Sequence, residues 1–186
     1  MLDLPPNFGL RRLRGALGKF NGRKSAVDIG AHKGIWTKVM MGEFERVYSF
    51  EPVKENFDVL KEINSCSYQV ALGDKAGSGG MIPGENTGMW HLTKDINSMG
   101  TNIEMLDSYN LTEIDFIKID VEGYELHVLE GAKVTVNKYK PAILLEENGL
   151  CDRYGVTRED IWSYMGAIGY SNVANWQGDY LFINGH

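Results

Sequence analysis

The chain has 186 residues, 43% of them apolar and 24% charged, with a formal net charge of −6 at pH 7. This length and composition predict one folded domain rather than a disordered segment, and the acidic balance argues against non-specific nucleic-acid binding. No apolar run approaches the roughly 20 residues that a membrane-spanning helix needs, and no secretory signal is visible, so no transmembrane segment is expected.

Residues 1–24 carry an excess of positive charge. Asp3 is the single acid among six basic side chains, which are Arg11, Arg12, Arg14, Lys19, Arg23 and Lys24. Such a segment can contact phosphate or an acidic membrane surface, but a solvated helical arm ahead of the core is the expected arrangement. We therefore divide the chain into a basic N-terminal arm (1–24) and a single domain (25–186).

From residue 25 onward, short apolar runs alternate with stretches of helical periodicity. Strands are predicted at 25–29, 46–50, 67–72, 115–120 and 141–146, and helices at 34–41, 52–64, 126–136 and 157–168. Residues 75–114 contain six glycines and are interpreted as hairpins and loops beside the sheet. Residues 170–173 and 180–183 form a closing hairpin. The alternation predicts an α/β fold with a mostly parallel sheet and helices on both faces.

The two cysteines indicate a reducing environment. Cys66 and Cys151 are far apart in sequence and form no C-x-x-C pair. Two lone thiols in a chain of this size fit a reducing compartment better than a disulfide framework. We therefore expect a cytoplasmic protein.

The turn after the first strand is the first candidate for a ligand site, because ligands of such sheets bind beyond the carboxyl ends of the strands. It reads Asp28-Ile-Gly30-Ala31-His32-Lys-Gly34. The glycines allow a tight turn, Asp28 can bind a cationic amine directly or through water, and the following helix offers free N–H groups to an anion. An ordinary strand-to-helix turn is the alternative.

The next two strand ends suggest a nucleoside site. Glu51 lies 23 residues after Asp28, and an acid about 20 residues beyond a glycine-rich turn can accept both hydroxyls of a ribose. It is equally a favourable acid at a helix N-terminus. Ala71 and Leu72 end the third strand, where a backbone N–H and the Leu72 side chain can hold an adenine. Asp74 can reach the exocyclic amine or simply form the turn.

The last two parallel strands end in acidic residues. Asp120, Glu122 and Glu125 fall within six residues, an arrangement that is costly unless a cation or a proton lies among them. Glu146 and Glu147 follow the next strand, and we expect one of the two to point inward. Carboxylates also suit Mg²⁺ or Ca²⁺, but the spacing matches no compact metal loop, so no metal is expected.

Taken together, these segments resemble the FkbM family of S-adenosylmethionine-dependent methyltransferases. The matching segments are Asp28-x-Gly-Ala-x-x-Gly34, Glu51-Pro52, Ala71-Leu-Gly-Asp74, Ile117-Lys-Ile-Asp-Val-Glu-Gly-Tyr-Glu125 and Val128-Leu129-x-Gly-Ala132. The resemblance implies a Rossmann-like class I methyltransferase fold, with a mostly parallel seven-stranded sheet and an antiparallel last strand. One position departs from the family pattern, because His32 stands where the family usually has Asn.

The resemblance also implies a binding site for S-adenosylmethionine. Asp28, Gly30 and Gly34 would face its methionine part, with Ala31 and His32 in the same turn. Glu51 would hold the ribose, Ala71, Leu72 and Asp74 the adenine, and Asp120 the methionine end near the sulfonium. The family is similar to enzymes that methylate hydroxyl groups on sugars, glycans and polyketides, so a hydroxyl of such a molecule is the expected acceptor.

Transfer to a hydroxyl is helped by a general base. The candidates are Asp120 and Glu122, followed by Glu147 and His91. His91 and the neighbouring Trp90 lie in the glycine-rich segment, where we expect substrate contacts, although hairpin packing explains the two equally well.

Two other functions stay open. An NAD-dependent oxidoreductase is one, although Gly30-x-x-x-Gly34 lacks the G-x-G-x-x-G pattern that binds a pyrophosphate. The other is a non-catalytic protein that binds S-adenosylmethionine, or an interaction module that uses the basic arm.

Overall fold

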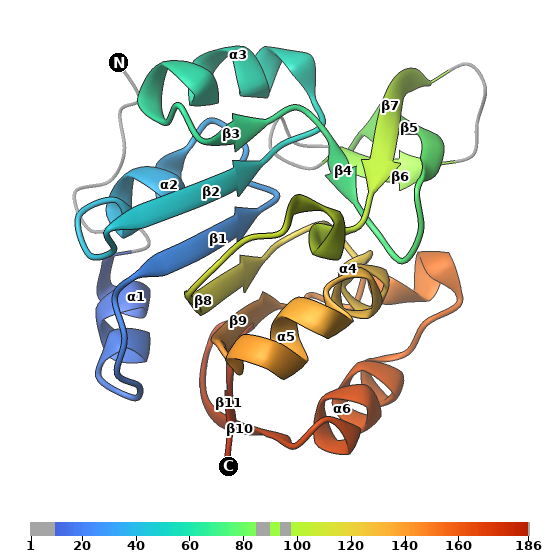
Figure 1. The fold of residues 1–186 in the computed structure, drawn as a ribbon. Coiled ribbons are helices and arrows are strands. Elements are labelled where there is room, and N and C mark those ends of the chain that lie inside the picture. The colour runs from blue at the N-terminus through green and yellow to red at the C-terminus, as the bar shows by residue number, and fades with distance from the viewer. Residues whose placement is uncertain (1–9, 85–89, 94–97, 186) are drawn as a thin grey trace.

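A computed structural model describes residues 10–84, 90–93 and 98–185 (Figure 1). Residues 1–9 of the basic arm, and residues 85–89 and 94–97 of the glycine-rich segment, lie outside the described residues. Among the residues that are described, no helix is long and apolar enough to cross a bilayer.

The main sheet has seven strands in the order β10-β11-β9-β8-β1-β2-β3. They are β1 (Ser25–Ile29), β2 (Arg46–Phe50), β3 (Ser67–Tyr68), β8 (Ile114–Ile119), β9 (Ala142–Glu146), β10 (Tyr170–Trp176) and β11 (Asp179–Asn184). The strands from β9 to β3 are parallel, and β11 is antiparallel to both of its neighbours. Strand order reverses between β1 and β8, so the crevice at their carboxyl ends is the expected ligand position.

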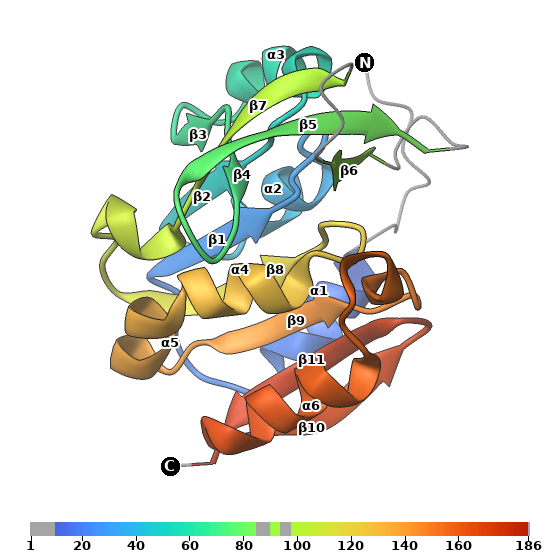
Figure 2. The same cartoon turned by 90° about the vertical axis from the view of Figure 1, so that its right-hand side faces the viewer.

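Helices cover both faces of this sheet (Figures 1 and 2). α1 (Leu10–Leu17) and α2 (Ile35–Met40) lie on one face with α3 (Lys54–Ile63) beside them, and α4 (Glu125–Gly131), α5 (Lys133–Tyr139) and α6 (Arg158–Ala167) cover the other. Successive residues of the central strands pack into opposite cores: Val27 and Ile117 into one, Ala26 and Phe116 into the other. This burial on both faces explains why the strands appear as continuous apolar runs in the sequence.

α1 corrects the expectation of a solvated arm. Leu13 and Ala16 are fully buried and belong to the same apolar cluster as Phe116. The basic side chains occupy the rest of the helix, so α1 is an amphipathic helix that covers the sheet.

A second correction concerns residues 67–72, which form two short strands instead of one. β3 pairs with β2 of the main sheet, whereas β4 (Ala71–Leu72) pairs with β7 of a second sheet, whose order is β4-β7-β5-β6. Its other strands, β5 (Gly77–Pro83), β6 (Trp90–Thr93) and β7 (Met99–Glu104), are antiparallel, as the glycine-rich segment predicts. This sheet lies beyond the carboxyl ends of β1 and β2 (Figure 1).

The remaining elements differ from expectation only in detail. The helix predicted at 126–136 is divided at Ala132 into α4 and α5, and two short 3₁₀ helices, η1 (Leu106–Tyr109) and η2 (Cys151–Tyr154), follow β7 and β9. α6 begins with a capping box, in which Thr157 and Asp160 each accept a hydrogen bond from the other's backbone N–H.

Gly131, at the end of α4, offers a test of how the second sheet is attached. A Cβ added at Gly131 would lie 1.9 Å from the carbonyl oxygen of Gly73, in the turn after β4. We expect Gly131→Ala to lower the free energy of unfolding by about 1–3 kcal/mol, because backbone must move to admit the methyl group. Urea denaturation measures this.

Gly166→Ala is the matched control, since a Cβ there would meet nothing within 4 Å. It lies inside α6, so Ala should raise stability by up to about 1 kcal/mol. Equal stability of the two variants would contradict the proposed close contact.

Candidate functional site

A cavity of about 220 Å³ opens at the carboxyl ends of β1, β2, β8 and β9. The turn after β1, Glu51 and the acids after β8 and β9 form one side of it, and β4, β5 and β6 form the other. The polar and glycine residues of its wall are Arg12, Gly30, His32, Glu51, Asn56, Lys118, Asp120, Glu122, Glu146 and Asp179, and apolar wall residues include Ala31, Ala71, Leu72, Met81, Trp90 and Leu92. Segments far apart in the chain therefore meet at one cavity.

The turn after β1 is shaped by close contact with β8. Gly30 has a φ of +77°, and a Cβ there would lie 1.7 Å from the carbonyl oxygen of Asp120. His32 has a φ of +49°, a left-handed conformation that Asn and His adopt more readily than most residues. The replacement of the family's Asn by His32 is therefore compatible with the backbone of this turn.

Glu51 is fixed by the same turn. Its carboxylate accepts hydrogen bonds from the backbone N–H groups of His32 at 2.8 Å and Val53 at 2.9 Å, and from Asn56 Nδ2 at 3.4 Å. A carboxylate has about four lone-pair positions, so at least one is left for a ligand hydroxyl. Glu51 is 5% exposed, and its burial raises its pKa to about 7.

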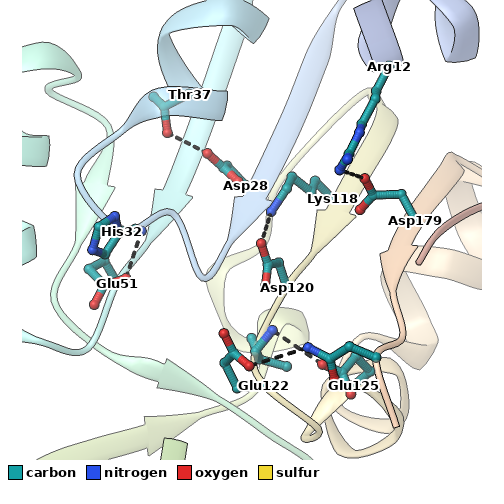
Figure 3. A network of polar contacts seen from close by, with 12 residues as sticks. Arg12, Asp28, His32, Thr37, Glu51, Lys118, Asp120, Glu122, Glu125 and Asp179 are labelled. Carbon is teal, nitrogen blue, oxygen red and sulfur yellow. Dashed lines mark hydrogen bonds and ion pairs between the residues drawn. The ribbon is translucent and has the colours of Figure 1, made fainter. Parts of the chain in front are cut away.

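Lys118 is the centre of a buried polar cluster. It is 2% exposed, its Nζ lies 2.8 Å from Asp120 Oδ2, and it also interacts with Asp28 and with the ring of Trp36. Figure 3 shows its side chain among Asp28, Asp120 and Asp179. Burial alone would lower the pKa of Lys118, but the attraction of Asp120 and Asp28 outweighs it and raises the pKa. Lys118 is therefore a buried cation that the surrounding carboxylates require.

Asp120 and Glu146 lie side by side on the cavity wall, because they follow Ile119 and Leu145, which are partners in the parallel pair of β8 and β9. The closeness of Asp120, together with burial, raises the pKa of Glu146 to about 9. Burial would also raise the pKa of Asp120, but Lys118 and the neighbouring Glu146 lower it. At neutral pH, Asp120 is thus the ionised member and Glu146 the protonated one.

Arg12 of α1 and Asp179 of β11 complete this side of the cavity. They form an ion pair in which the Asp179 side chain is 3% exposed and the Arg12 side chain 26%. Burial raises the pKa of Asp179, and Arg12 opposes this effect. The two ends of the described chain are thereby joined at the cavity (Figure 3).

The loop after β8 is held by Glu125. This buried side chain accepts hydrogen bonds from the backbone N–H groups of Val121 at 3.3 Å and Gly123 at 2.9 Å, and its burial raises its pKa to about 7. Between them, Glu122 has a φ of +57° and lines the cavity. Glu125 therefore orders the loop, while Glu122 is available to a ligand.

Asp28 and Gly34 do not lie on the cavity wall. Asp28 is fully buried, and its Oδ2 accepts a hydrogen bond from Thr37 Oγ1 at 2.6 Å. A Cβ at Gly34 would meet Leu60 and Ile63 of α3 at 3.0 Å, so this glycine allows helix packing. These two residues of the predicted cofactor site support the turn from behind.

Asp74 and His91 line a second cavity instead, of about 750 Å³, between the second sheet and the aromatic side chains of Tyr124 and Tyr154. Leu92 lines both cavities. Burial and the negative charge of Asp74 raise the pKa of Tyr124, and burial, together with the charge of Arg153, lowers the pKa of His91. Asp74 does not line the first cavity because the chain turns away after Leu72. His91 does not line it because its neighbours Trp90 and Leu92 face that cavity from the other side of β6.

Glu147, which the sequence analysis named as a candidate base, does not line the first cavity either. It is 3% exposed, forms an ion pair with Arg158 and accepts a hydrogen bond from the backbone N–H of Gly149 at 2.7 Å. Consecutive strand residues point to opposite sides, so Glu146 faces the cavity and Glu147 faces α6.

The sequence analysis missed several residues of the wall. Lys118 had a signal, since a lone lysine in the run Ile114-Asp-Phe-Ile-Lys-Ile119 must find anionic partners if the strand is buried. Nothing in the sequence indicated that Arg12 and Asp179 line the cavity, because the two residues are 167 positions apart. Among the residues that the structure describes, no group of three or more His, Cys, Asp or Glu side chains is placed to hold a metal ion.

Comparison with known proteins identifies the family. A family profile for the methyltransferase FkbM domain matches residues 28–171. The chain belongs to the FkbM methyltransferase family. No curated protein matches its sequence significantly.

Similarity to solved structures shows that this chain has the class I methyltransferase fold. An FkbM methyltransferase from Methylobacillus flagellatus superposes with a TM-score of 0.62 at 20% identity, over 91% of this chain and 45% of that one. The chain thus spans less than half of that protein. The N-methyltransferase NodS from Bradyrhizobium japonicum, in complex with S-adenosylhomocysteine, gives 0.55 at 12% identity, over 100% and 91%.

The fold alone does not define the reaction. A precorrin 8W decarboxylase from Methanobacterium thermoautotrophicum has a TM-score of 0.53 at 14% identity, over 97% of this chain and 90% of that one. The reaction must therefore be argued from the site.

The role of Lys118 can be tested by Lys118→Met, which removes the ammonium and keeps the length of the side chain. We expect a loss of about 3–5 kcal/mol in unfolding free energy at pH 8, because buried carboxylates lose their cation. The loss should shrink at pH 5, since protonation of Asp120 and Asp28 relieves their repulsion.

Urea denaturation at the two pH values measures both effects. Lys38→Met, on the exposed side of α2, is the control and should change little at either pH. A pH-independent loss in Lys118→Met would show that Lys118 acts by packing alone.

Proposed function

We propose that the first cavity binds S-adenosylmethionine and that the protein transfers its methyl group to a hydroxyl. Glu51 carries this proposal, because it lines the crevice beside an FkbM turn with its carboxylate held by two backbone N–H groups. It would accept a ribose hydroxyl, and Ala71 and Leu72 would contact the adenine.

The other end of the cavity suits the cationic part of this molecule. Asp120, Glu122 and Glu146 line it, and Gly30 leaves space where any side chain would strike the β8 backbone. Behind the turn, Asp28 Oδ1 is a buried oxygen without a hydrogen-bond partner among the described residues. These groups favour a sulfonium and an ammonium, whereas a pyrophosphate would be repelled, which argues against the NAD-dependent oxidoreductase.

Asp120 is the proposed general base. When bound, S-adenosylmethionine supplies an electrophilic methyl group: the acceptor oxygen forms the new C–O bond, the C–S electrons return to sulfur, and the hydroxyl proton leaves. Asp120 is ionised at neutral pH, lies on the cavity wall and is held by Lys118 Nζ. It can therefore receive that proton at a carboxylate oxygen, with Glu122 as the alternative.

The acceptor is proposed to be a hydroxyl of a sugar, glycan or polyketide-like molecule that enters past the second sheet. Trp90 and Leu92 of β6 line the first cavity, and His91 lines the second one beside it. Aromatic and imidazole groups beside an opening suit a polyhydroxylated ligand, which supports the substrate-facing role of this segment. A cytoplasmic location is supported by Cys66 and Cys151, which are both free thiols.

Cofactor binding can be tested with Glu51→Ala. We expect affinity for S-adenosylhomocysteine to fall by about 1–3 kcal/mol, because hydrogen bonds to the ribose are lost. The wild-type affinity should also fall as the pH drops below about 7, where Glu51 becomes protonated. Calorimetry measures both.

Glu55→Ala, at an exposed position on α3, is the control for the loss of a nearby charge and should bind as the wild type does. Wild-type affinity in Glu51→Ala would contradict the ribose assignment.

The base is tested by Asp120→Asn, assayed by methyl transfer to a panel of hydroxylated sugars and glycans. We expect kcat to fall by about 10²–10⁴-fold, because proton acceptance is lost. S-adenosylhomocysteine should still bind. Full activity would assign the proton to another group, with Glu122→Gln as the next variant to test, and no transfer by the wild type to any acceptor would favour the non-catalytic alternative.

A further inference from the structure

The cluster at the end of β8 contains more acidic groups than basic ones. Within the part of the chain that the structure describes, Lys118 and Arg12 interact with four carboxyl groups, those of Asp28, Asp120, Glu146 and Asp179. Asp28 and Asp179 are buried and Asp120 and Glu146 are partly buried, so two cations leave an excess of negative charge in the cluster. Such an excess favours protonation of one of the carboxyl groups or the binding of a further cation.

The strand register locates one of these protons. Asp120 and Glu146 follow Ile119 and Leu145, which are partners in the parallel pair of β8 and β9, and both line the cavity, so their carboxyl groups lie side by side. Two neighbouring carboxylates do not both ionise readily, and Lys118 Nζ, 2.8 Å from Asp120 Oδ2, keeps Asp120 ionised. The proton consequently lies on Glu146, in keeping with its pKa of about 9.

Both members of the pair line the cavity, at the end that the proposed function assigns to the sulfonium. S-adenosylmethionine has a permanent positive charge at that atom, and S-adenosylhomocysteine has a neutral sulfur in the same place. The two ligands otherwise share the adenosyl and amino-acid groups. The two ligands therefore differ chiefly in the charge of the sulfur atom that would lie beside Asp120 and Glu146.

We propose that the Asp120–Glu146 pair distinguishes the two ligands: Glu146 releases its proton when the sulfonium binds and keeps it when the neutral sulfur binds. This inference rests on the proposed function. A cation close to a carboxyl group favours its ionised form, so the sulfonium takes the place of the proton in the charge balance. The released proton passes from the Glu146 carboxyl to solvent.

The exchange has a consequence for the reaction. With the sulfonium present, both carboxyl groups are ionised, so the pair can accept the proton of the acceptor hydroxyl. After transfer the sulfur is neutral and the pair again carries one proton, so the total charge of the cluster is restored.

Other titratable and charged groups also face the pair. Lys118 and Glu122 come from β8 and the loop after it, Asp28 and His32 from β1 and its turn, and Asp179 and Arg12 from β11 and α1. These groups, and Glu51, meet the same adenosyl and amino-acid parts of both ligands. The ratio of the two dissociation constants therefore isolates the response to the sulfonium.

The test is calorimetric titration of the wild-type protein with each ligand between pH 6.5 and pH 8.5, in two buffers of different ionisation enthalpy. We expect the ratio of Kd for S-adenosylhomocysteine to Kd for S-adenosylmethionine to rise with pH, approaching about tenfold per pH unit for one full proton. S-adenosylmethionine should release up to one more proton than S-adenosylhomocysteine. A pH-independent ratio with equal proton release would overturn the inference.

Glu146→Gln supplies the second arm, because its amide can still donate to Asp120 but cannot ionise. We expect its ratio to be constant with pH and its proton release to be the same for both ligands. Glu130→Gln removes one charge at an exposed position of α4 and should behave as the wild type does.

The outcomes separate the two proposals. If neither ligand binds the wild-type protein, the proposed function fails. If both bind but the pH dependence persists in Glu146→Gln, only the role of Glu146 fails. Should Glu146→Gln not fold, the wild-type proton count decides the question by itself.

Discussion

The structure of the site depends on one buried ammonium group. Lys118 stands in a central strand between Ile117 and Ile119, and its Nζ is within reach of the carboxyl groups of Asp28 in β1 and Asp120 after β8. Without that cation, the carboxyl ends of these strands would bring like charges together in a poorly solvated place. With it, Asp120 stays ionised on the cavity wall, Asp28 is held behind the turn, and Glu146 carries a proton. Positions that would otherwise repel one another are thereby kept at a single crevice.

The two ends of the crevice differ in how their acidic groups are held and in which of them are ionised. The nucleoside end is defined by Glu51, which receives its hydrogen bonds from backbone and is therefore fixed in place. The reacting end is defined by charge, with acids that accept cations and protons. Trp90, Leu92 and Met81 of the second sheet line the space between these two ends. The family and the fold are established by the FkbM match and the solved structures, and the acceptor is a matter for the proposed assays.

Much of the fold could be predicted because the parallel strands are buried on both faces and end in recognisable turns. The sequence also placed Gly30, Glu51, Ala71, Leu72, Asp120 and Glu122 at one edge, since parallel strands share their carboxyl ends. Predictions failed where the deciding contact is distant in sequence. Asp74 leaves the site because β4 joins β7, and Arg12 enters it because α1 packs on the sheet. The choice between Glu146 and Glu147 depended on the phase of one strand, which a run of four buried residues conceals.

The contact between Gly30 and the Asp120 carbonyl has a further implication for how this site can change over time. The backbone that shapes the ligand turn rests directly on the backbone that carries the base. A mutation that moves either strand end by a fraction of an ångström would disturb both functions together. We therefore expect evolutionary changes in substrate specificity to occur mainly in the second sheet, because its residues can change while the contact between Gly30 and Asp120 is preserved.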